Sequence, residues 1–258
     1  MGARVDLNCD MGESFGSWKM GADEEVLASV SSANIACGYH AGDPAVMRRT
    51  VRAAREAGVA VGAHPGLPDL VGFGRREMSV QPSDVEDMVL YQVGALAAFA
   101  AAEGVRLRHV KAHGALYNMA ARDVSLASAI ARSVAAFDRD LVLFGLAGSV
   151  LLEAGRNAGL HVASEGFADR AYEPDGSLTP RSRPRAVIDD PDRVVERAVR
   201  MVTEGRVTAT DGSDVALHVD TLCTHGDTPG APSLVRRLRA GLERRGIAVR
   251  PAWDRTDA

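Results

Sequence analysis

The chain has 258 residues, 46% hydrophobic content, a net charge of −4 and three cysteines. That length suits one sizeable core, so a single domain is expected over residues 1–258. The acidic balance disfavours nucleic acid and anionic membrane as partners, and three scattered cysteines disfavour a disulfide framework. With no apolar leader at the N-terminus, a cytoplasmic enzyme is expected, and a homo-oligomer is left open.

Predicted strands and helices alternate along the chain. The β-rich runs cover residues 5–10, 32–38, 59–64, 108–113, 141–146, 161–166 and 215–225. Helical patterns stop at a glycine before several β-rich stretches, as expected for a left-handed residue after a helix: Gly58, Gly104, Gly159, Gly205 and Gly246. Since strands separated by helices pair in parallel, this order favours a parallel β/α fold.

Helix starts can be read from three short patterns. Asp43 and Asp190 each precede a proline, which is typical of an N-cap followed by the first helical residue. Ser83 with Glu86 predicts a capping box at the start of the long apolar helix near residues 83–103.

Polar residues follow nearly every predicted strand, and this decides between two architectures. A doubly wound open sheet gathers its site at one switch point, whereas a (β/α) barrel carries functional residues at most strand ends. The barrel is therefore the favoured prediction, and the strand ends should meet at one mouth. The residues expected there are Asn8, Asp10, Glu13, Asn34, Tyr39, His40, Asp43, His64, Lys111, His113, Glu165, Asp169, Arg170 and His225.

A divalent-metal site is predicted from Asp10, His40 and His64, which follow three successive strands. A carboxylate and two imidazoles can bind an ion such as Zn²⁺ or Mg²⁺ and leave a position for water. The alternative is that one imidazole is simply a hydrogen-bonded pocket residue, because no short metal-binding motif is present.

Lys111 and His113 lie two residues apart, so on one strand their side chains share a face. Together with Asp10 and Glu13 they are the predicted catalytic groups. A lysine in a partly buried mouth can bind an anion or act as a base, although an ammonium that reaches solvent is the alternative.

The remaining strand-end residues are predicted to bind substrate: Asn8, Asn34, Tyr39, Asp43, Glu165, Asp169, Arg170 and His225. Four of these residues have structural alternatives. Asp43 can serve only as an N-cap, Asp169 with Arg170 can form a solvated loop pair, and His225 can cap the segment that follows it.

Long stretches of the sequence resemble the LamB/YcsF lactam-utilisation family. They are DLNCDMGESFG at 6–16, ANIACGYHAGDP at 33–44, GAHPGLPDLVGFGRR at 62–76, VKAHGALYN at 110–118, EGFADRAY at 165–172 and CTHGDTPGA at 223–231. The resemblance implies a seven-stranded β/α barrel of the glycoside hydrolase/deacetylase type. It also implies ATP-dependent hydrolysis of 5-oxoproline (pyroglutamate) to L-glutamate, as the A subunit of a 5-oxoprolinase that includes B and C subunits.

Roles for several residues follow from this resemblance and from the chemistry of a lactam. Asp10 would be a general base or metal ligand, His40 and His64 would contact a metal or an oxyanion, and Lys111 would bind the substrate carboxylate or an ATP phosphate. The sequence has no GxxxxGK[ST] motif, so ATP requires another kind of site or another subunit. Two rival functions stay open: a metal-dependent deacetylase or amidohydrolase that acts alone, and a non-catalytic subunit that presents substrate.

Overall fold

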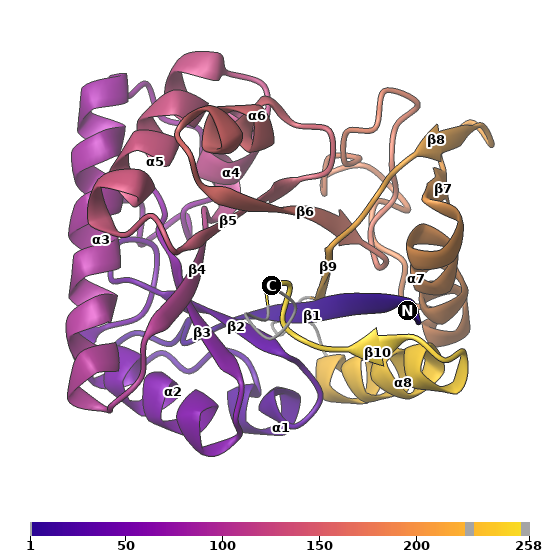
Figure 1. Cartoon of the computed structure of the whole chain (residues 1–258), viewed down its shortest axis with the longest axis horizontal. Helices are drawn as coiled ribbons and strands as arrows, with labels where there is room; N and C mark the ends of the chain where they lie inside the picture. The colour runs from indigo at the N-terminus through magenta and orange to yellow at the C-terminus, as the bar shows by residue number, and fades with distance from the viewer. Residues whose placement is uncertain (1, 225–229, 254–258) are drawn as a thin grey trace.

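Seven parallel strands close into a barrel in this computed structural model, which describes residues 2–224 and 230–253. The strands, in order around the ring seen in Figure 1, are β1 (Arg4–Met11), β2 (Ser32–Ala36), β3 (Ala60–His64), β4 (Leu107–Lys111), β5 (Val142–Leu146), β6 (His161–Phe167) and β9 (Thr221–Thr224). Closure is made where β9 pairs with β1, with Asp6 opposite Thr221 and Cys9 opposite Thr224. The barrel prediction is confirmed, and the open sheet is excluded.

Helices surround this ring on its outer side (Figure 1). They are α1 (Asp23–Leu27), α2 (Pro44–Glu56), α3 (Pro82–Ala102), α4 (Gly114–Ala120), α5 (Val124–Phe137), α6 (Val150–Asn157), α7 (Pro191–Glu204) and α8 (Ala231–Arg244). A short strand, β10 (Ala248–Val249), pairs with the start of β1. β10 therefore lies at the N-terminal end of β1, away from the C-terminal strand ends where the site is expected.

The helix starts agree with the sequence at two of three places. Asp43 and Asp190 are N-caps whose side chains accept backbone N–H groups of the first turn. The capping box at Ser83 is wrong, because α3 begins at Pro82 with Gln81 as its N-cap and Ser83 already lies within the helix. Proline fits the first helical position, since its missing N–H would have no partner there.

The run predicted as one strand over 215–225 is two strands. β8 (Asp214–Ala216) forms an antiparallel hairpin with β7 (Arg206–Thr208) outside the barrel, and only β9 enters the ring. Asp220 separates the two strands, since its N–H donates to Ser164 O and its carboxylate accepts Ser164 N–H, both at 2.8 Å. This side-chain contact with β6 gives no signal in the alternation of residues along the chain.

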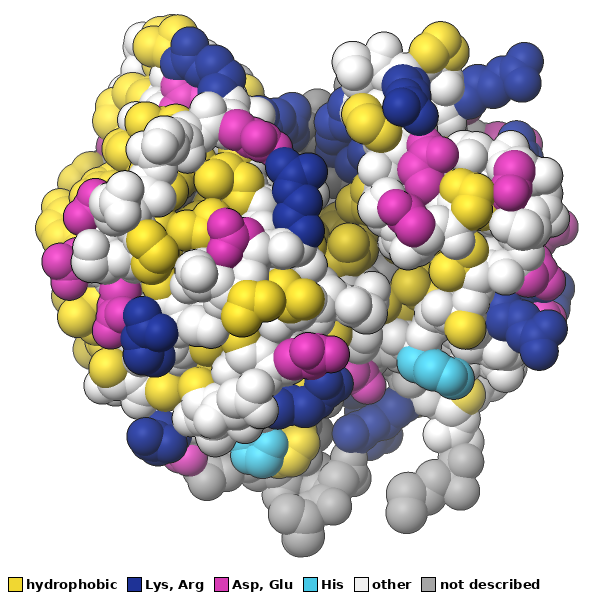
Figure 2. All heavy atoms as spheres, turned by 90° about the horizontal axis from the view of Figure 1, so that it is seen from above, with side chains coloured by type: hydrophobic (Ala, Val, Ile, Leu, Met, Phe, Trp, Pro, Cys, Tyr) yellow, Lys and Arg dark blue, Asp and Glu magenta, His cyan; other side chains and the backbone are white. Residues whose placement is uncertain are grey.

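The core is made of aliphatic residues from the strands and the inner helix faces, including Leu7, Ile35, Val110 and Leu143. α3 is long and apolar enough to cross a membrane by length and composition alone, but Val89, Val93 and Leu96 of its inner face are buried. It is therefore a helix of the barrel. On the face shown in Figure 2, acidic and basic side chains are interspersed.

Candidate active site

The side chains of β1 that face into the barrel form the base of the site. Asp6, Asn8 and Asp10 alternate along the strand, so all three point into the barrel. Asp6 and Asn8 are fully buried, whereas the side chain of Asp10 keeps 16% of its surface exposed. Asp10 is thus the end of this polar row that reaches the mouth.

Lys111 is the centre of a first group of polar side chains. Its ammonium lies 2.9 Å from Glu165 Oε1, 3.1 Å from Asp10 Oδ1 and 3.3 Å from Asn8 Oδ1. It also lies 3.1 Å from the sulfur of Cys223. With 3% exposure, this lysine does not reach solvent, and its three N–H groups have protein acceptors.

Neighbouring amides and a phenol complete the same group. Asn34 donates to Asn8 Oδ1 at 2.7 Å and to Asp10 Oδ1 at 2.8 Å, and Asn8 donates to Glu165 Oε1 at 2.9 Å. Tyr117, from α4, donates to Glu165 Oε2 at 2.7 Å. We call this group the lysine network, and it comprises Asn8, Asp10, Asn34, Lys111, Tyr117 and Glu165.

The lysine network stabilises a charged ammonium group that burial alone would disfavour. Burial works against the ammonium of Lys111, but the carboxylates of Asp10 and Glu165 outweigh it and hold the pKa of Lys111 well above its ordinary value. The lysine therefore stays protonated at neutral pH.

A second group, the histidine cluster, lies beside the first and comprises Glu13, His40, His64 and His113. All four side chains are buried, and one ligand atom from each lies within 4.8 Å of the others. The imidazoles of His40 and His113 stack with ring centroids 3.7 Å apart, and His64 lies edge-on to both. His64 Nε2 is 3.3 Å from Asp10 Oδ2, so the two groups adjoin.

The hydrogen bonds of His64 and His113 determine where their protons are. His64 Nδ1 is 2.7 Å from Lys111 O, and His113 Nε2 is 2.8 Å from Phe73 O. Because a carbonyl oxygen only accepts, both of these nitrogens carry hydrogen. The other two nitrogens, His64 Nε2 and His113 Nδ1, lie 3.0 Å apart, so two neutral rings would direct lone pairs at each other. A positive charge at this point, as a metal ion or an added proton, removes that repulsion.

His40 adds a third imidazole whose ring nitrogens have no hydrogen-bond partner among the described residues. Its Nε2 is 3.7 Å from Glu13 Oε1, which is also 3.7 Å from His113 Nδ1. Burial lowers the pKa of His40 well below its ordinary value, and the neighbouring imidazoles of His113 and His64 lower it further. Burial likewise lowers the pKa of His113 to about 3. The imidazoles of His40 and His113 are therefore neutral at physiological pH, and each has a nitrogen lone pair that can bind a metal ion.

Several predicted substrate-binding residues lie elsewhere in the loops. Tyr39 packs against Tyr91 of α3, with ring centroids 5.6 Å apart. Asp43 caps α2 and also accepts Gly16 N–H at 2.7 Å, which ties the loop after β1 to α2.

In the loop after β6, Arg170 donates to the carbonyls of Thr179 and Ala186, and Asp169 is buried. Arg170 is thus buried and stabilises the backbone of the loop, and it does not form a solvated ion pair with Asp169. His225 lies outside the described residues.

Three residues of the interior were missed by sequence reasoning. Tyr117 contacts Glu165, and Thr221 accepts from Asn8 at 2.7 Å and donates to Asp6 at 2.6 Å. Asp6 could have been found, since it precedes Asn8 and Asp10 with the same two-residue spacing. Tyr117 lies on a helix, where strand periodicity gives no signal.

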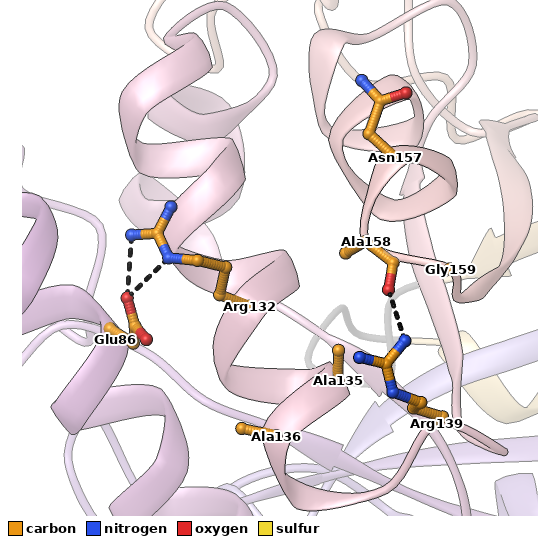
Figure 3. A pocket seen from close by; sticks show the side chains of 8 residues that line it. All are labelled: Glu86, Arg132, Ala135, Ala136, Arg139, Asn157, Ala158 and Gly159. Atoms are coloured by element: carbon orange, nitrogen blue, oxygen red, sulfur yellow. Dashed lines mark hydrogen bonds and ion pairs between the residues drawn. The ribbon is translucent and has the colours of Figure 1, made fainter.

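A separate hollow on the outside of the barrel holds no comparable chemistry. Figure 3 shows its charged side chains engaged locally: Arg132 pairs with Glu86, and Arg139 donates to the carbonyl oxygen of Ala158. The remaining lining residues are small or neutral, including Ala135, Ala136 and Asn157. The mouth of the barrel is therefore the candidate site.

Comparison with known proteins places this site in a family. The sequence matches the model of the LamB/YcsF family over residues 5–257. The chain belongs to the LamB/YcsF family. A relative from Bordetella parapertussis, named as the A subunit of 5-oxoprolinase, is 59% identical over 252 residues, with 98% of this chain and 100% of the relative covered. A relative of the same name from Tolumonas auensis is 60% identical over 248 residues, covering 96% and 99%.

Solved structures support the same placement in the LamB/YcsF family. The lactam utilization protein from Thermus thermophilus superposes with a TM-score of 0.91 at 54% identity, covering 96% of this chain and 99% of that one. A putative cellobiose-phosphate cleavage protein from Enterococcus faecalis has a TM-score of 0.57 at 14% identity, covering 98% of each chain, and shares the fold alone. The names of the similar proteins indicate a hydrolase role in lactam utilisation, as one subunit of a larger enzyme.

Proposed function

We propose that this chain contains the site that hydrolyses 5-oxoproline to L-glutamate, as the A subunit of an ATP-dependent, cytoplasmic 5-oxoprolinase that includes B and C subunits. The observation that carries the proposal is the position of Asp10 at the barrel mouth. Its carboxylate lies between the ammonium of Lys111 and the imidazole of His64, and it keeps contact with solvent. The names of the close relatives supply the substrate.

The chemical difficulty is that the ring amide of 5-oxoproline is an unstrained and poor electrophile. Transfer of the γ-phosphoryl group of ATP to the lactam oxygen would release ADP and make the ring carbon electrophilic. Water would then attack that carbon, and the ring C–N bond would break to leave an acyl phosphate on the side chain of glutamate. A second water would hydrolyse this acyl phosphate, so the products are glutamate, ADP and phosphate.

Within this scheme Asp10 is the general base. Its carboxylate lies 3.1 Å from the ammonium of Lys111 and would accept a proton from the attacking water. Lys111 is held by Asp10 and Glu165 at 3.1 and 2.9 Å, so its role is to keep Asp10 charged and oriented rather than to bind the substrate carboxylate directly. Asn34 holds the same Asp10 oxygen at 2.8 Å and restricts its rotation.

A divalent metal ion held by Glu13, His40, His64 and His113 is also part of the proposal. Such an ion fits the facing nitrogens of His64 and His113, the buried carboxylate of Glu13, and the nitrogens of His40, which have no hydrogen-bond partner in the described part of the chain. Three imidazoles favour Zn²⁺ or a similar ion over Mg²⁺, which prefers oxygen ligands. When bound, the ion would polarise a carbonyl or acidify a water beside Asp10.

ATP is assigned to the assembled enzyme rather than to a particular pocket of this chain. The sequence contains no P-loop, so the phosphates would be held by another kind of site at the mouth or by a partner protein. This division of labour agrees with an enzyme of several subunits, which the names of the relatives indicate.

The test is to measure glutamate and ADP release from 5-oxoproline and ATP, with the chain alone and with the B and C subunits. Asp10→Asn should reduce turnover by about 100-fold or more, as is typical when a positioned base is lost, and Asp189→Asn on the surface should not. Full turnover by Asp10→Asn would overturn the proposal. Hydrolysis by the chain alone without ATP would indicate the deacetylase or amidohydrolase rival. Substrate binding with turnover indifferent to Asp10→Asn and His64→Gln would indicate a presenting subunit.

A further inference from the structure

The loop between β3 and α3 contains a compact arrangement that the catalytic proposal does not use. Asp69 is buried, and its carboxylate accepts Gly72 N–H at 2.9 Å. Arg76 pairs with the same carboxylate, with its Nε 2.9 Å from Oδ2. The carbonyl of Asp69 accepts Gly74 N–H at 2.8 Å. One aspartate therefore holds the backbone on both sides of Phe73.

Phe73 has a backbone conformation that it would not adopt by preference. Its φ is +54°, in the left-handed region that a bulky side chain rarely occupies. Such a conformation persists only where surrounding contacts impose it, and it is a reason to look for a function. Here it directs the carbonyl of Phe73 at His113 Nε2, at 2.8 Å.

This carbonyl decides which nitrogen of His113 faces the histidine cluster. Because Nε2 must carry the hydrogen that it donates to Phe73 O, the lone pair of neutral His113 is on Nδ1. Nδ1 is the nitrogen that lies 3.0 Å from His64 Nε2 and 3.7 Å from Glu13 Oε1. The other tautomer would direct an N–H into the cluster and remove one of the lone pairs that can bind a metal ion.

The loop is also fixed to the elements that carry the imidazoles. Ala115 N–H donates to Gly74 O at 2.9 Å, and His113 N–H donates to Pro65 O at 2.8 Å. A Cβ at Gly74 would lie 2.8 Å from His40 Cβ and 2.9 Å from His113 Cδ2, so the loop backbone packs against the side chain of His40 and the ring of His113. These contacts restrict the movement of the loop backbone next to the carbonyl of Phe73.

We infer that Asp69, secured by Arg76, is a positioning residue that sets the tautomer and orientation of His113 through the carbonyl of Phe73, and so prepares the histidine cluster to bind a metal ion. This inference rests on the proposed metal site. It follows the general pattern in which the outer nitrogen of a metal-binding histidine donates to a carbonyl or carboxylate. Here a left-handed loop supplies that carbonyl, and an ion pair maintains the loop.

Two measurements on the full-length chain test the inference. The first is the tautomer of His113 in the metal-free protein, from long-range ¹⁵N–¹H correlation of the imidazoles, with His113→Gln identifying the signal. The second is the affinity for Zn²⁺ by competition with a chelator. Asp69→Asn should give His113 a mixture of tautomers and weaken Zn²⁺ binding by about 10–100-fold. Arg76→Lys, which keeps the charge but loses the fork geometry, should give a smaller loss.

The matched control is Asp192→Asn, which breaks an exposed pair with Arg237 far from this loop in the sequence and should change neither measurement. An unchanged tautomer and unchanged Zn²⁺ affinity in Asp69→Asn would overturn the inference. If the unmodified chain bound no Zn²⁺, the metal proposal would fail by itself, and the tautomer measurement would still decide the role of Asp69. If Asp69→Asn did not fold, Arg76→Lys would supply both readouts, and wild-type values in that variant would then count against the inference.

Discussion

The lysine network and the histidine cluster lie side by side in one barrel mouth but differ in how their polar atoms are satisfied. In the lysine network, the ammonium of Lys111 is surrounded by Asp10, Glu165 and Asn8, and Tyr117 donates to Glu165. In the histidine cluster, the ring nitrogens of His40 lack hydrogen-bond partners among the described residues, and His64 Nε2 and His113 Nδ1 lie 3.0 Å apart, where two neutral rings would direct lone pairs at each other.

This difference indicates that the lysine network supports the fold and that the histidine cluster is a binding site. A buried charge that is fully paired contributes to a fixed structure, whereas buried polar atoms left without partners cost stability until a ligand satisfies them. The lysine network should therefore matter for folding even without any ligand. The histidine cluster should add to stability only when its ligand is present.

The largest effect expected from this comparison is on the lysine network. Lys111→Met leaves the buried carboxylate of Glu165 and the partly exposed carboxylate of Asp10 without their cation, and loss of one partner of a buried ion pair costs about 3–5 kcal/mol. Urea unfolding of the metal-free chain should show a loss of that size. Lys19, the only other lysine of the sequence, is exposed, so Lys19→Met is a matched control. A small loss in Lys111→Met, equal to that of the control, would contradict the scaffold role.

A pH dependence is expected at Asp6, which lies next to the lysine network and is connected to Asn8 through Thr221. Asp6 contacts Thr221, which accepts from Asn8, and it accepts hydrogen bonds from Ser31 and Ser32. Burial raises the pKa of Asp6 to about 6, against an ordinary value of 3.8. Between these values the folded chain binds the proton more tightly than the unfolded chain. The free energy of unfolding should therefore fall as pH rises from about 4 to about 6, by roughly 3 kcal/mol for a shift of this size.

Asp6→Asn should remove this part of the pH dependence, because an amide does not ionise. The measurement is the difference in unfolding free energy between the unmodified chain and Asp6→Asn, by urea titration at several pH values from about 4 to about 7, the range that spans the two pKa values of this carboxyl group. Asp189→Asn on the surface is the control. If the difference between the unmodified chain and Asp6→Asn did not change across this range, the ionisation of Asp6 would have no part in stability.

The smallest effect, and the sharpest contrast, is expected in the histidine cluster. His40→Leu removes two buried nitrogens that lack partners among the described residues and keeps a similar volume, so the metal-free chain should change in stability by less than about 1 kcal/mol. Zn²⁺ at about 100 times its dissociation constant should stabilise the unmodified chain by about 2.7 kcal/mol. It should not stabilise His40→Leu at the same concentration. Equal stabilisation of both chains would show that His40 is not a ligand.

Much of the fold was determined by local sequence signals. Helix stops at glycines such as Gly58 and Gly205, and N-caps at Asp43 and Asp190, were predicted because they depend on backbone conformation and on neighbours within a few residues. The barrel followed from polar residues at successive strand ends. Local signals failed at Ser83, where a proline took the first helical position, and at residues 215–225, where a contact with β6 divides the run into two strands.

For the site, the sequence determined which residue types reach the mouth, because each follows a buried strand whose end faces the same way. Only the tertiary structure decided which of these residues belong to the lysine network and which to the histidine cluster. The sequence grouped Asp10 with His40 and His64, and Asp10 does lie 3.3 Å from His64. Closure of the barrel also brings Lys111 and Asn34 to the carboxylate of Asp10, and it places Glu13 and His113 beside His40 and His64. These partners are far apart in the sequence, and their distances and proton positions depend on strand register and on one left-handed loop residue, Phe73, which no local pattern in the sequence specifies.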